Sequence, residues 1–429
     1  MKEKDDDMTR SDHTGPLAAS PSVIQKRRSF TKLLGLGAIA GAGMTATVSS
    51  GAASISSAAQ SFLNVKDFGA FGDGTNDDQA AIQAALDSVG TSGGVVYFPP
   101  GTYRINFPVF IKSKVNSTSG FVVCGSGQNC TLQAGPDFPA NVAMLYILGG
   151  NGVVEDIGLD GSGRAQNGIE YAYPTPERPD DRTVTISRLA FSRMLSNGFH
   201  CVGGEAYQIR DSFFNSIGGY AIYSRSGGIN SFIDGNYILG CGGVFLGAEQ
   251  AQAEGVRITN NTILCSAGSG YGVYVDRGLE IIIAHNIIDQ VATGSIKITN
   301  NSSYVKCLGN WLSCHQGGGI VLQVDGNANS VTISDNTFEG GSFQLSVVSE
   351  VIGSIHSVTV HNNIFNNTSD TAMFFHNAAE VSIIGNHCRT SGKESLFWGD
   401  GRHGLAMGNV LWKGPNVGSG LTQNTNLGW

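Results

Sequence analysis

The chain has 429 residues, of which only 14% are charged, and its formal net charge is −8. A chain this poor in Lys and Arg, with no basic tract longer than a few residues, gives no support for nucleic-acid binding. The eight Cys residues form no C-x-x-C pair and no Cys/His set at zinc spacing, so no metal site is indicated.

Residues 1–59 are predicted to lie outside the folded domain. A charged leader precedes the stretch KRRSFTK, which begins at Lys26 and is followed by an apolar run rich in Gly and Ala. This arrangement resembles a twin-arginine export signal. The run is too short and too glycine-rich to span a bilayer, and small residues offer cleavage after Ala53 or Ala59. We therefore expect export of the folded protein to the periplasm or the cell exterior, with no membrane span in the mature chain.

Residues 60–106 are predicted to form an N-terminal cap module. A Gly/Asp-rich turn from Gly69 to Gly74 precedes a helix whose N-terminus is capped by Asp77 or Asp78. One face of that helix is apolar at helical spacing and consists of Ile82, Ala85, Leu86 and Val89. Such a helix would cover the open end of the strands that follow and block edge pairing.

From about Thr183 to Trp412 one short pattern recurs at intervals of 23 to 27 residues. Its mark is an asparagine between apolar residues, and the positions are Asn236, Asn261, Asn286, Asn310, Asn336, Asn363, Asn386 and Asn409. A strand-like segment precedes each asparagine and a second follows it, with period-two alternation and with Gly and Asn at the corners. A fixed period in this range indicates a repeat architecture.

The period predicts an all-β fold, a right-handed single-stranded parallel β-helix over residues 60–413. Successive coils would stack at about 4.8 Å. The recurring asparagines would form an internal ladder that has a structural and not a catalytic role. Cys241 and Cys265 follow two ladder positions at nearly the same offset, so we expect them on adjacent coils, either as buried thiols or as a disulfide. Residues 414–429 lose the period and are predicted to be a tail, either packed on the open end or disordered.

The string NVKDFGAFGDGTNDDQAAIQAAL, with GGVVYFPPGTY after it, closely resembles the N-terminal module of the pectate-lyase-like superfamily. That group includes polygalacturonase-like enzymes, alginate epimerases, polysaccharide lyases and phage tailspikes. The resemblance implies a right-handed parallel β-helix and a carbohydrate polymer as ligand, but no particular reaction, because the shared module is the cap. The polygalacturonase motif set and the Y-G-F-D-P-H-E string of the alginate epimerases are missing.

Stacked coils would align outward side chains of the second strands in columns. The first predicted column contains Tyr223, Phe245, Tyr274, Lys297, Val321, Gln344, Phe374 and Phe397. The second contains Arg225, Gly247, Asp276, Thr299, Gln323, Ser346, His376 and Gly399. Aromatic faces suit the C–H faces of sugars and fixed charges orient hydroxyls or carboxylates. We therefore predict substrate binding by Tyr223, Arg225, Phe245, Tyr274 and Arg277.

Two chemistries remain open for this surface. Hydrolysis or transglycosylation needs two carboxyl groups, and Asp276 with Glu249 from the preceding coil is the preferred pair. Lytic β-elimination needs a cation beside a uronate carboxylate and a base, which Arg225, Lys297 and the tyrosines could supply. The predicted catalytic residues are thus Asp276, Glu249 and Lys297. The carboxylates favour a glycoside hydrolase or transglycosylase, with a polysaccharide lyase as the alternative.

A structural interpretation competes with both. An Asp and an Arg on adjacent coils often form a surface ion pair of little energetic value, and aromatic rings can pack under a loop or a second subunit. The chain would then be a non-catalytic β-helix that binds glycan or builds a surface layer. The long loop of residues 171–181 could wall a groove and contribute Glu177, Asp180 or Asp181. No cofactor is indicated, Ca²⁺ has no support, and a monomer or a homotrimer fits the superfamily.

Overall fold

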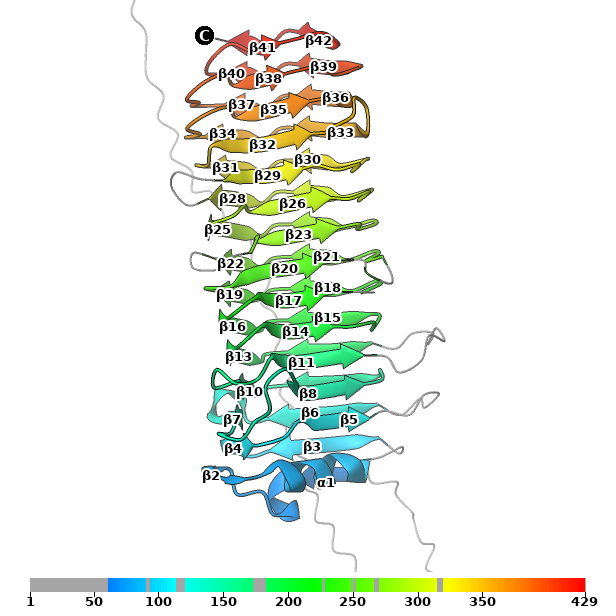
Figure 1. Cartoon of the computed structure of the whole chain (residues 1–429), viewed down its shortest axis with the longest axis vertical. Helices are drawn as coiled ribbons and strands as arrows, with labels where there is room; N and C mark the ends of the chain where they lie inside the picture. The colour runs from blue at the N-terminus through cyan, green and yellow to red at the C-terminus, as the bar shows by residue number, and fades with distance from the viewer. Residues whose placement is uncertain are drawn as a thin grey trace, which may run out of the picture. The chain divides into compact units, whose positions relative to one another are not determined.

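The computed structural model describes residues 61–89, 93–112, 120–172, 183–225, 228–247, 249, 252–265, 270–314 and 319–428. The predicted export signal lies outside these residues, and so do Glu177, Asp180 and Asp181 of the long loop. The described chain is a parallel β-helix, as predicted, and its successive turns contribute strands to three parallel sheets (Figure 1).

Sheet A has fifteen strands, in spatial order β1 (Ser61–Asn64), β3 (Gly94–Phe98), β6 (Phe121–Gly125), β9 (Gly152–Glu155), β12 (Val184–Ser187), β15 (Tyr207–Arg210), β18 (Phe232–Asp234), β21 (Arg257–Thr259), β24 (Ile282–Ala284), β27 (Lys306–Leu308), β30 (Thr332–Ser334), β33 (Ile355–His361), β36 (Ala378–Ile384), β39 (Gly404–Met407) and β42 (Leu421–Asn424).

Sheet B also has fifteen strands, in the order β2 (Asp73–Asp77), β4 (Gly101–Ile105), β7 (Cys130–Ala134), β10 (Gly158–Asp160), β13 (Ala190–Met194), β16 (Phe213–Ile217), β19 (Tyr237–Leu239), β22 (Thr262–Leu264), β25 (Ile287–Val291), β28 (Trp311–Cys314), β31 (Thr337–Glu339), β34 (Ile364–Asn366), β37 (His387–Cys388), β40 (Val410–Leu411) and β43 (Leu427–Gly428).

Sheet C has thirteen strands, in the order β5 (Val109–Lys112), β8 (Ala143–Leu148), β11 (Asn167–Ala172), β14 (Asn197–Cys201), β17 (Tyr220–Ser224), β20 (Gly242–Leu246), β23 (Val273–Asp276), β26 (Ile296–Thr299), β29 (Ile320–Val324), β32 (Phe343–Val348), β35 (Met373–His376), β38 (Leu396–Trp398) and β41 (Asn416–Val417).

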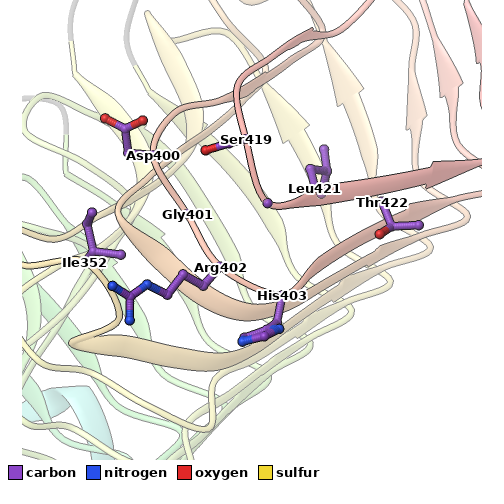
Figure 2. Close-up of a pocket in the computed structure, with 9 residues that line it drawn as sticks. Ile352, Asp400, Gly401, Arg402, His403, Ser419, Leu421 and Thr422 are labelled. Carbon is purple, nitrogen blue, oxygen red and sulfur yellow. The ribbon is translucent and has the colours of Figure 1, made fainter.

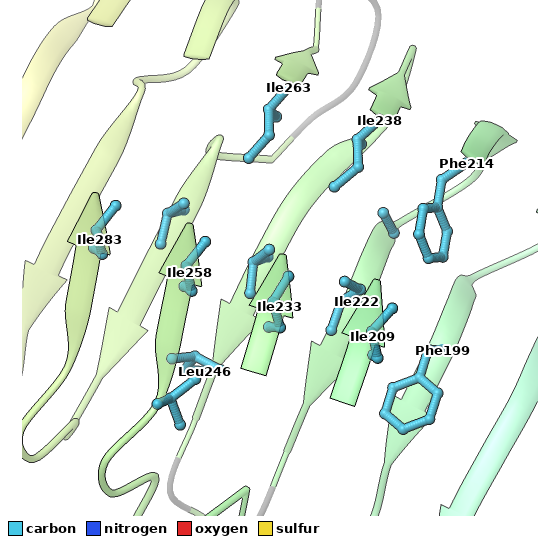
Figure 3. Close-up of a cluster of buried hydrophobic side chains, with 14 of the residues drawn as sticks. Phe199, Ile209, Phe214, Ile222, Ile233, Ile238, Leu246, Ile258, Ile263 and Ile283 are labelled. Atoms are coloured by element: carbon cyan, nitrogen blue, oxygen red, sulfur yellow. The ribbon is translucent and has the colours of Figure 1, made fainter. Parts of the chain in front are cut away.

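The interior of the coil is filled by apolar side chains that repeat at one position per strand. On sheet A, Ile209, Ile233, Ile258 and Ile283 stack directly upon one another, and all are fully buried (Figure 3). Sheets B and C supply matching inward rows, for example Ile238 and Val244. Each buried side chain of this size contributes about 1.5–3 kcal/mol relative to exposure, so the column of neighbours fixes the register as well as the stability.

The asparagine ladder lies at the turn between sheets A and B. The Nδ2 of Asn310 donates to the carbonyl of Ile283 on the coil before it and to Oδ1 of Asn336 on the coil after it, both at 2.9 Å. The same pattern runs through all eight predicted asparagines, which are at most 2% exposed. The ladder is therefore structural, as predicted.

The residue before each ladder asparagine has a left-handed backbone. These residues are Gly235, Asn260, His285, Gly309, Asp335, Asn362, Gly385 and Gly408, with φ between 57° and 68°. This requirement explains the Gly, Asn and Asp at these corners, because they adopt positive φ at the lowest cost. His285 is accordingly a corner residue of the fold.

The α-helix α1 (Gln79–Val89) follows the 3-10 helix η1 (Val65–Phe68) and buries Ile82, Ala85 and Val89 against the first coil. The carboxylate of Asp77 accepts the N–H of Gln79 at 3.2 Å. Asp78 has a different task, because its two oxygens accept the N–H groups of Phe71 and Gly72 at 2.6 and 3.0 Å. The acidic pair therefore ties the glycine turn to the start of the helix.

The segment after Lys413 adds a further coil. β41, β42 and β43 pair in parallel with β38, β39 and β40, and Asn426 accepts from Asn409 as a ninth rung of the ladder. The strands are short and mostly exposed, which is why period-two alternation is faint there. The repeat thus extends past the point where the sequence indicated a tail.

A second 3-10 helix, η2 (Gly127–Asn129), connects β6 and β7.

None of the eight cysteines forms a disulfide in the described structure, and Cys241 and Cys265 are fully buried. The sequence left buried thiols and a disulfide open for this pair, and the structure contains buried thiols. Burial raises the pKa of both, that of Cys241 to about 12. Cys307, which is also fully buried, has its pKa raised to about 12 by the same cause.

We expect Asn310→Ala to lower the free energy of unfolding by about 2–4 kcal/mol, because it removes the acceptor of the Asn286 backbone N–H and of one Nδ2 hydrogen of Asn286, and the donor to the Ile283 carbonyl. Urea unfolding followed by circular dichroism measures this. The matched control is Asn366→Ala on β34, since the Asn366 side chain makes no hydrogen bond within the described residues. Equal loss of stability in both variants would contradict the role given to the ladder.

Alkaline pH should destabilise the fold through the buried thiols. An unfolded thiol ionises near pH 9, whereas that of folded Cys307 ionises near pH 12. A folded pKa above the unfolded one adds stability that is complete below pH 9 and is lost as the pH rises from 9 to 12. Cys307→Val should therefore lose less stability between pH 8 and pH 10 than the unsubstituted protein in urea unfolding. An identical decline in both proteins would show that this thiol does not contribute.

Candidate functional site on sheet C

One outward position on sheet C forms a continuous column of side chains, which we call the sheet C column. In order it contains Phe110, Tyr146, Glu170, His200, Tyr223, Phe245, Tyr274, Lys297, Gln323, Ser346, Phe374 and Phe397. Neighbouring members lie one strand spacing apart, about 4.8 Å. Tyr223, Phe245, Tyr274 and Lys297 occupy four consecutive places, in the order that the sequence predicted.

Two members of the predicted first column are wrong. Gln323 and Ser346 stand in the places expected for Val321 and Gln344, and the latter two residues are fully buried. The same shift removes Gln323 and Ser346 from the predicted second column. A displacement of two residues leaves the alternation of a strand unchanged, so the period-two pattern could not reveal it.

The aromatic part of the site holds five rings and not three. Tyr223 stacks on Phe245 with ring centroids 4.5 Å apart, and Phe245 meets Tyr274 edge-on at 5.1 Å. Tyr220 lies 5.5 Å from Phe245, and Tyr271 lies 5.3 Å from Tyr274. The sequence contained a signal for the two missed rings, since each tyrosine stands three residues before a column tyrosine.

Lys297 closes this aromatic cluster at its C-terminal side. Its ammonium group lies 3.3 Å from Asp325 Oδ2 and 5.7 and 5.6 Å from the ring centroids of Tyr271 and Tyr274. Burial lowers the pKa of Lys297, but Asp325 and the two tyrosines outweigh it and raise the pKa above its usual value. Lys297 is therefore held as a cation at neutral pH.

The predicted carboxylate pair does not share a partner. Glu249 forms an ion pair with Arg225, and both side chains are about half exposed. Asp276 accepts from Nδ2 of Asn300 at 2.9 Å and lies 3.7 Å from Nε of Arg277. Both carboxylates nonetheless act on one ring, because each raises the pKa of Tyr223, to which burial contributes most. The phenol of Tyr223 is thus protonated at neutral pH and can donate a proton or a hydrogen bond.

Glu170 and His200 extend the column toward the N-terminus and were missed. His200 Nδ1 lies 3.3 Å from Glu170 Oε2, and its ring lies 5.5 Å from that of Tyr223. The two side chains are only 24% and 15% exposed. Their coils precede the first ladder asparagine, Asn236, so the spacing of the ladder does not align them with the later coils. The similar strings NGIEY, which begins at Asn167, and NGFHC, which begins at Asn197, place Glu170 and His200 at the same position of their coils.

His200 Nδ1 faces one hydrogen-bond donor, Asn167, and one acceptor, Glu170. Asn167 Nδ2 lies 3.2 Å away, and its orientation is set because Asn167 Oδ1 accepts from the backbone and side chain of Asn197. Nδ1 accepts from Asn167 in the tautomer that carries its proton on Nε2, and it donates to Glu170 when it carries a proton itself. Either tautomer of this ring therefore has a hydrogen-bond partner at Nδ1.

No group of three or more His, Cys, Asp and Glu residues that could hold a metal ion occurs within the residues that the structure describes. A cavity of about 720 Å³ lies far along the coil, lined by Asp400, Arg402 and His403 among others (Figure 2). It contains none of the predicted site residues.

Residues 62–295 match the family model "Rhamnogalacturonase A/epimerase, pectate lyase-like". The chain belongs to this family. Its members carry the pectate-lyase-like right-handed β-helix, which agrees with the resemblance found in the cap module. The matched region includes the sheet C column from Phe110 to Tyr274.

Mannuronan C5-epimerases of Azotobacter vinelandii are among the relatives. AlgE2 is 37% identical over 153 residues, which cover 32% of this chain and 15% of that protein. AlgE4 is 34% identical over 155 residues, which cover 32% and 27%. The plasmin and fibronectin-binding protein A of Streptococcus pneumoniae is 57% identical over 53 residues, which cover 12% and 7%. The chain thus spans well under a third of the length of these relatives.

The solved structure of the AlgE4 A-module from Azotobacter vinelandii has a TM-score of 0.65 at 19% identity and covers 85% of this chain and 100% of that module. The catalytic domain of a GH87 α-1,3-glucanase has a TM-score of 0.57 at 13% identity, with 82% and 67% covered. At these identities the similarity shows the shared fold. Within the described residues no helix is long and apolar enough to cross a membrane.

The electrostatics of Tyr223 can be tested directly. Glu249 raises the pKa of this phenol and Arg225 lowers it, so Glu249→Gln should shift the titration of Tyr223 to lower pH and Arg225→Gln to higher pH. Carbon-13 NMR of labelled tyrosine rings measures both. Arg389→Gln, an exposed substitution on another face, is the control and should leave the titration unchanged. If the titration of Tyr223 did not shift in either site variant, the Arg225–Glu249 ion pair would have no influence on the pKa of this phenol.

Proposed function

We propose that this is a carbohydrate-active protein that binds a uronate-containing polysaccharide across the sheet C column and moves the proton at C5 of a bound uronate. The observation that carries the proposal is the Glu170–His200 pair directly beside Tyr223, in a column that continues through the aromatic rings to Lys297. Epimerisation and β-elimination share this first step and differ in where the next proton is delivered.

The C5 proton of a uronate becomes acidic when the charge on its carboxylate is neutralised. Arg225 and Lys297 are the cations on this face that could do so, and preorganised charges of this kind lower the barrier most where solvent is excluded. Each is paired with a protein carboxylate, so a substrate carboxylate would compete with Glu249 or Asp325. The aromatic cluster between the cations would hold the sugar rings.

His200 is the base in this scheme and Tyr223 the acid. Glu170 would hold the imidazole and stabilise its protonated form, and the raised pKa of Tyr223 keeps its proton available. Delivery of that proton to C5 from the opposite face gives the epimer. Its delivery to the glycosidic oxygen at C4 gives chain cleavage by elimination. The family and the mannuronan C5-epimerase relatives support a uronate polymer as substrate.

Hydrolysis or transglycosylation through Asp276 and Glu249, with Lys297, is the second candidate. It is favoured by the proximity of both carboxylates to Tyr223 and by a relative described as a probable glucan endo-1,3-beta-glucosidase, 50% identical over 58 residues. A glycan-binding role without catalysis is the third, because the charges on this face are paired. We further propose export through the twin-arginine route and a monomeric or trimeric state.

The decisive experiment incubates the purified protein with polymannuronate, polygalacturonate and a neutral β-glucan. Proton NMR of the polymer reports epimerisation, ultraviolet absorbance reports unsaturated uronates, and reducing ends alone report hydrolysis. We expect activity on a uronate polymer and a loss of about 100-fold or more in kcat for His200→Gln, the range for removal of a general base. Arg389→Gln should keep full activity.

The same assay separates the candidates. Asp276→Asn and Glu249→Gln should abolish cleavage without changing thermal stability if the chain is a hydrolase, whereas proton abstraction by His200 predicts that Asp276→Asn retains activity. Full activity of His200→Gln would overturn the proposal. Binding of the polymer without any product would leave the glycan-binding role.

A further inference from the structure

A second hollow faces sheet A, on another side of the coil. Its volume is about 470 Å³, and its lining residues are Gln208, Arg210, Phe232, Asp234, Arg257 and Thr259. They come from β15, β18 and β21, three successive strands that each contribute two outward side chains. None of them belongs to the sheet C column.

The register arranges these six side chains as two short columns. Gln208, Phe232 and Arg257 are neighbours in one, and Arg210, Asp234 and Thr259 in the other. With strands about 4.8 Å apart and alternate residues about 7 Å apart, the grid measures about 10 by 7 Å. That is the footprint of a short stretch of saccharide.

The two arginines of this grid lack an acidic partner. Neither Arg210 nor Arg257 forms an ion pair within the part of the chain that the structure describes, although the protein as a whole is acidic. The guanidinium carbon of Arg257 lies 5.0 Å from the centroid of the Phe232 ring. Such stacking uses the face of the guanidinium group and none of its N–H donors, so it positions the group while leaving the donors for a ligand.

Asp234 is the one carboxylate among the lining residues, and one of its oxygens is already bound. Its Oδ1 accepts from Oγ1 of Thr259 at 2.6 Å and from Nδ2 of Asn260 at 2.8 Å. These bonds hold the carboxylate in place and leave Oδ2 without a hydrogen bond within the described residues. A fixed acceptor beside two cationic donors is suited to a ligand that carries both hydroxyl groups and negative charge.

A smaller hollow continues the surface along sheet A. It has a volume of about 340 Å³ and is lined by Glu280, Ile282, Tyr304 and Lys306. Ile282 is the neighbour of Arg257 and Lys306 the neighbour of Ile282, so the two hollows follow each other over five consecutive strands. Tyr304 is 57% exposed and adds an aromatic surface, and Lys306 adds a cation. The elongated arrangement fits a polymer better than a single small anion.

We propose that sheet A carries a second saccharide-binding site, specific for a carboxylate-bearing sugar chain. Arg210 and Arg257 bind the sugar carboxylate, for which the guanidinium fork has matching geometry, and Asp234 accepts from sugar hydroxyls. The site holds no acid–base pair of its own and serves to retain the polymer. It does not depend on the reaction assigned to sheet C, because the two sites share no residue.

The test is calorimetric titration of the full mature chain with a short oligomannuronate. Two binding events are expected. Arg210→Gln and Arg257→Gln should each weaken one of them by about tenfold, as loss of a charged hydrogen bond predicts, and the double variant should remove it. The paired variant Arg225→Gln/Lys297→Met on sheet C should remove the other event and leave the sheet A event intact. The control is Arg389→Gln, which should change neither.

Four outcomes would overturn the proposal. The first is loss of all binding in the sheet C variant, and the second is unchanged binding in the Arg210/Arg257 double variant with native thermal unfolding. The third is equal affinity of the sheet A site for a carboxyl-reduced, neutral oligosaccharide. Tighter binding of a sulfated oligosaccharide than of the oligomannuronate would also contradict carboxylate specificity. If the sheet C variant kept both binding events, the result would count against the proposed function and not against this site.

Discussion

The hydrogen bond from each ladder asparagine to the next sets the vertical register on which every functional surface of this protein depends. A side-chain amide buried in the coil must satisfy two N–H donors and a carbonyl, and here the adjacent coils supply the partners on both sides. A slip of one coil by a single residue would leave these groups unpaired and would also turn the apolar side chains outward. The ladder therefore holds residues that are one repeat apart in the sequence as neighbours on adjacent coils.

Fixed register has a direct consequence for the charges on the surface. Side chains at one position of adjacent coils are held about 4.8 Å apart, close enough for ion pairs and ring stacking but too close for unpaired like charges. On sheet C, Glu170 pairs with His200 at one such position. Arg225 and Lys297 pair with Glu249 and Asp325, which lie on the next coil two residues beyond the directly opposite position. On sheet A, by contrast, Asp234 is bound by Thr259 and Asn260, and the nearby arginines keep their donors. The charges on sheet C are thus paired, whereas Arg210 and Arg257 on sheet A form no ion pair within the described residues.

The sequence predicted those features that the ladder and the core impose. The asparagines, the left-handed corners and the order Tyr223, Phe245, Tyr274, Lys297 follow from a period that has little freedom between Asn236 and Asn310. The prediction failed on β29 and β32. A displacement by two residues preserves alternation, so Val321 and Gln344 were placed outside although they are buried, and Gln323 and Ser346 hold the column positions. No local pattern distinguishes the two registers, because only contacts with the neighbouring coil do so.

The same limit explains why Glu170 and His200 escaped notice. Their coils precede the ladder and are held by a different device, the Asn167–Asn197 contact at the start of β11 and β14. In this region a polar residue serves both the fold and the site, since Asn167 also contacts the imidazole of His200. A search for functional residues by chemical type would select exposed carboxylates such as Glu249 over this half-buried pair. Yet partial burial shields the contact between His200 and Glu170 from water, whereas both side chains of the Arg225–Glu249 pair are about half exposed and are screened more.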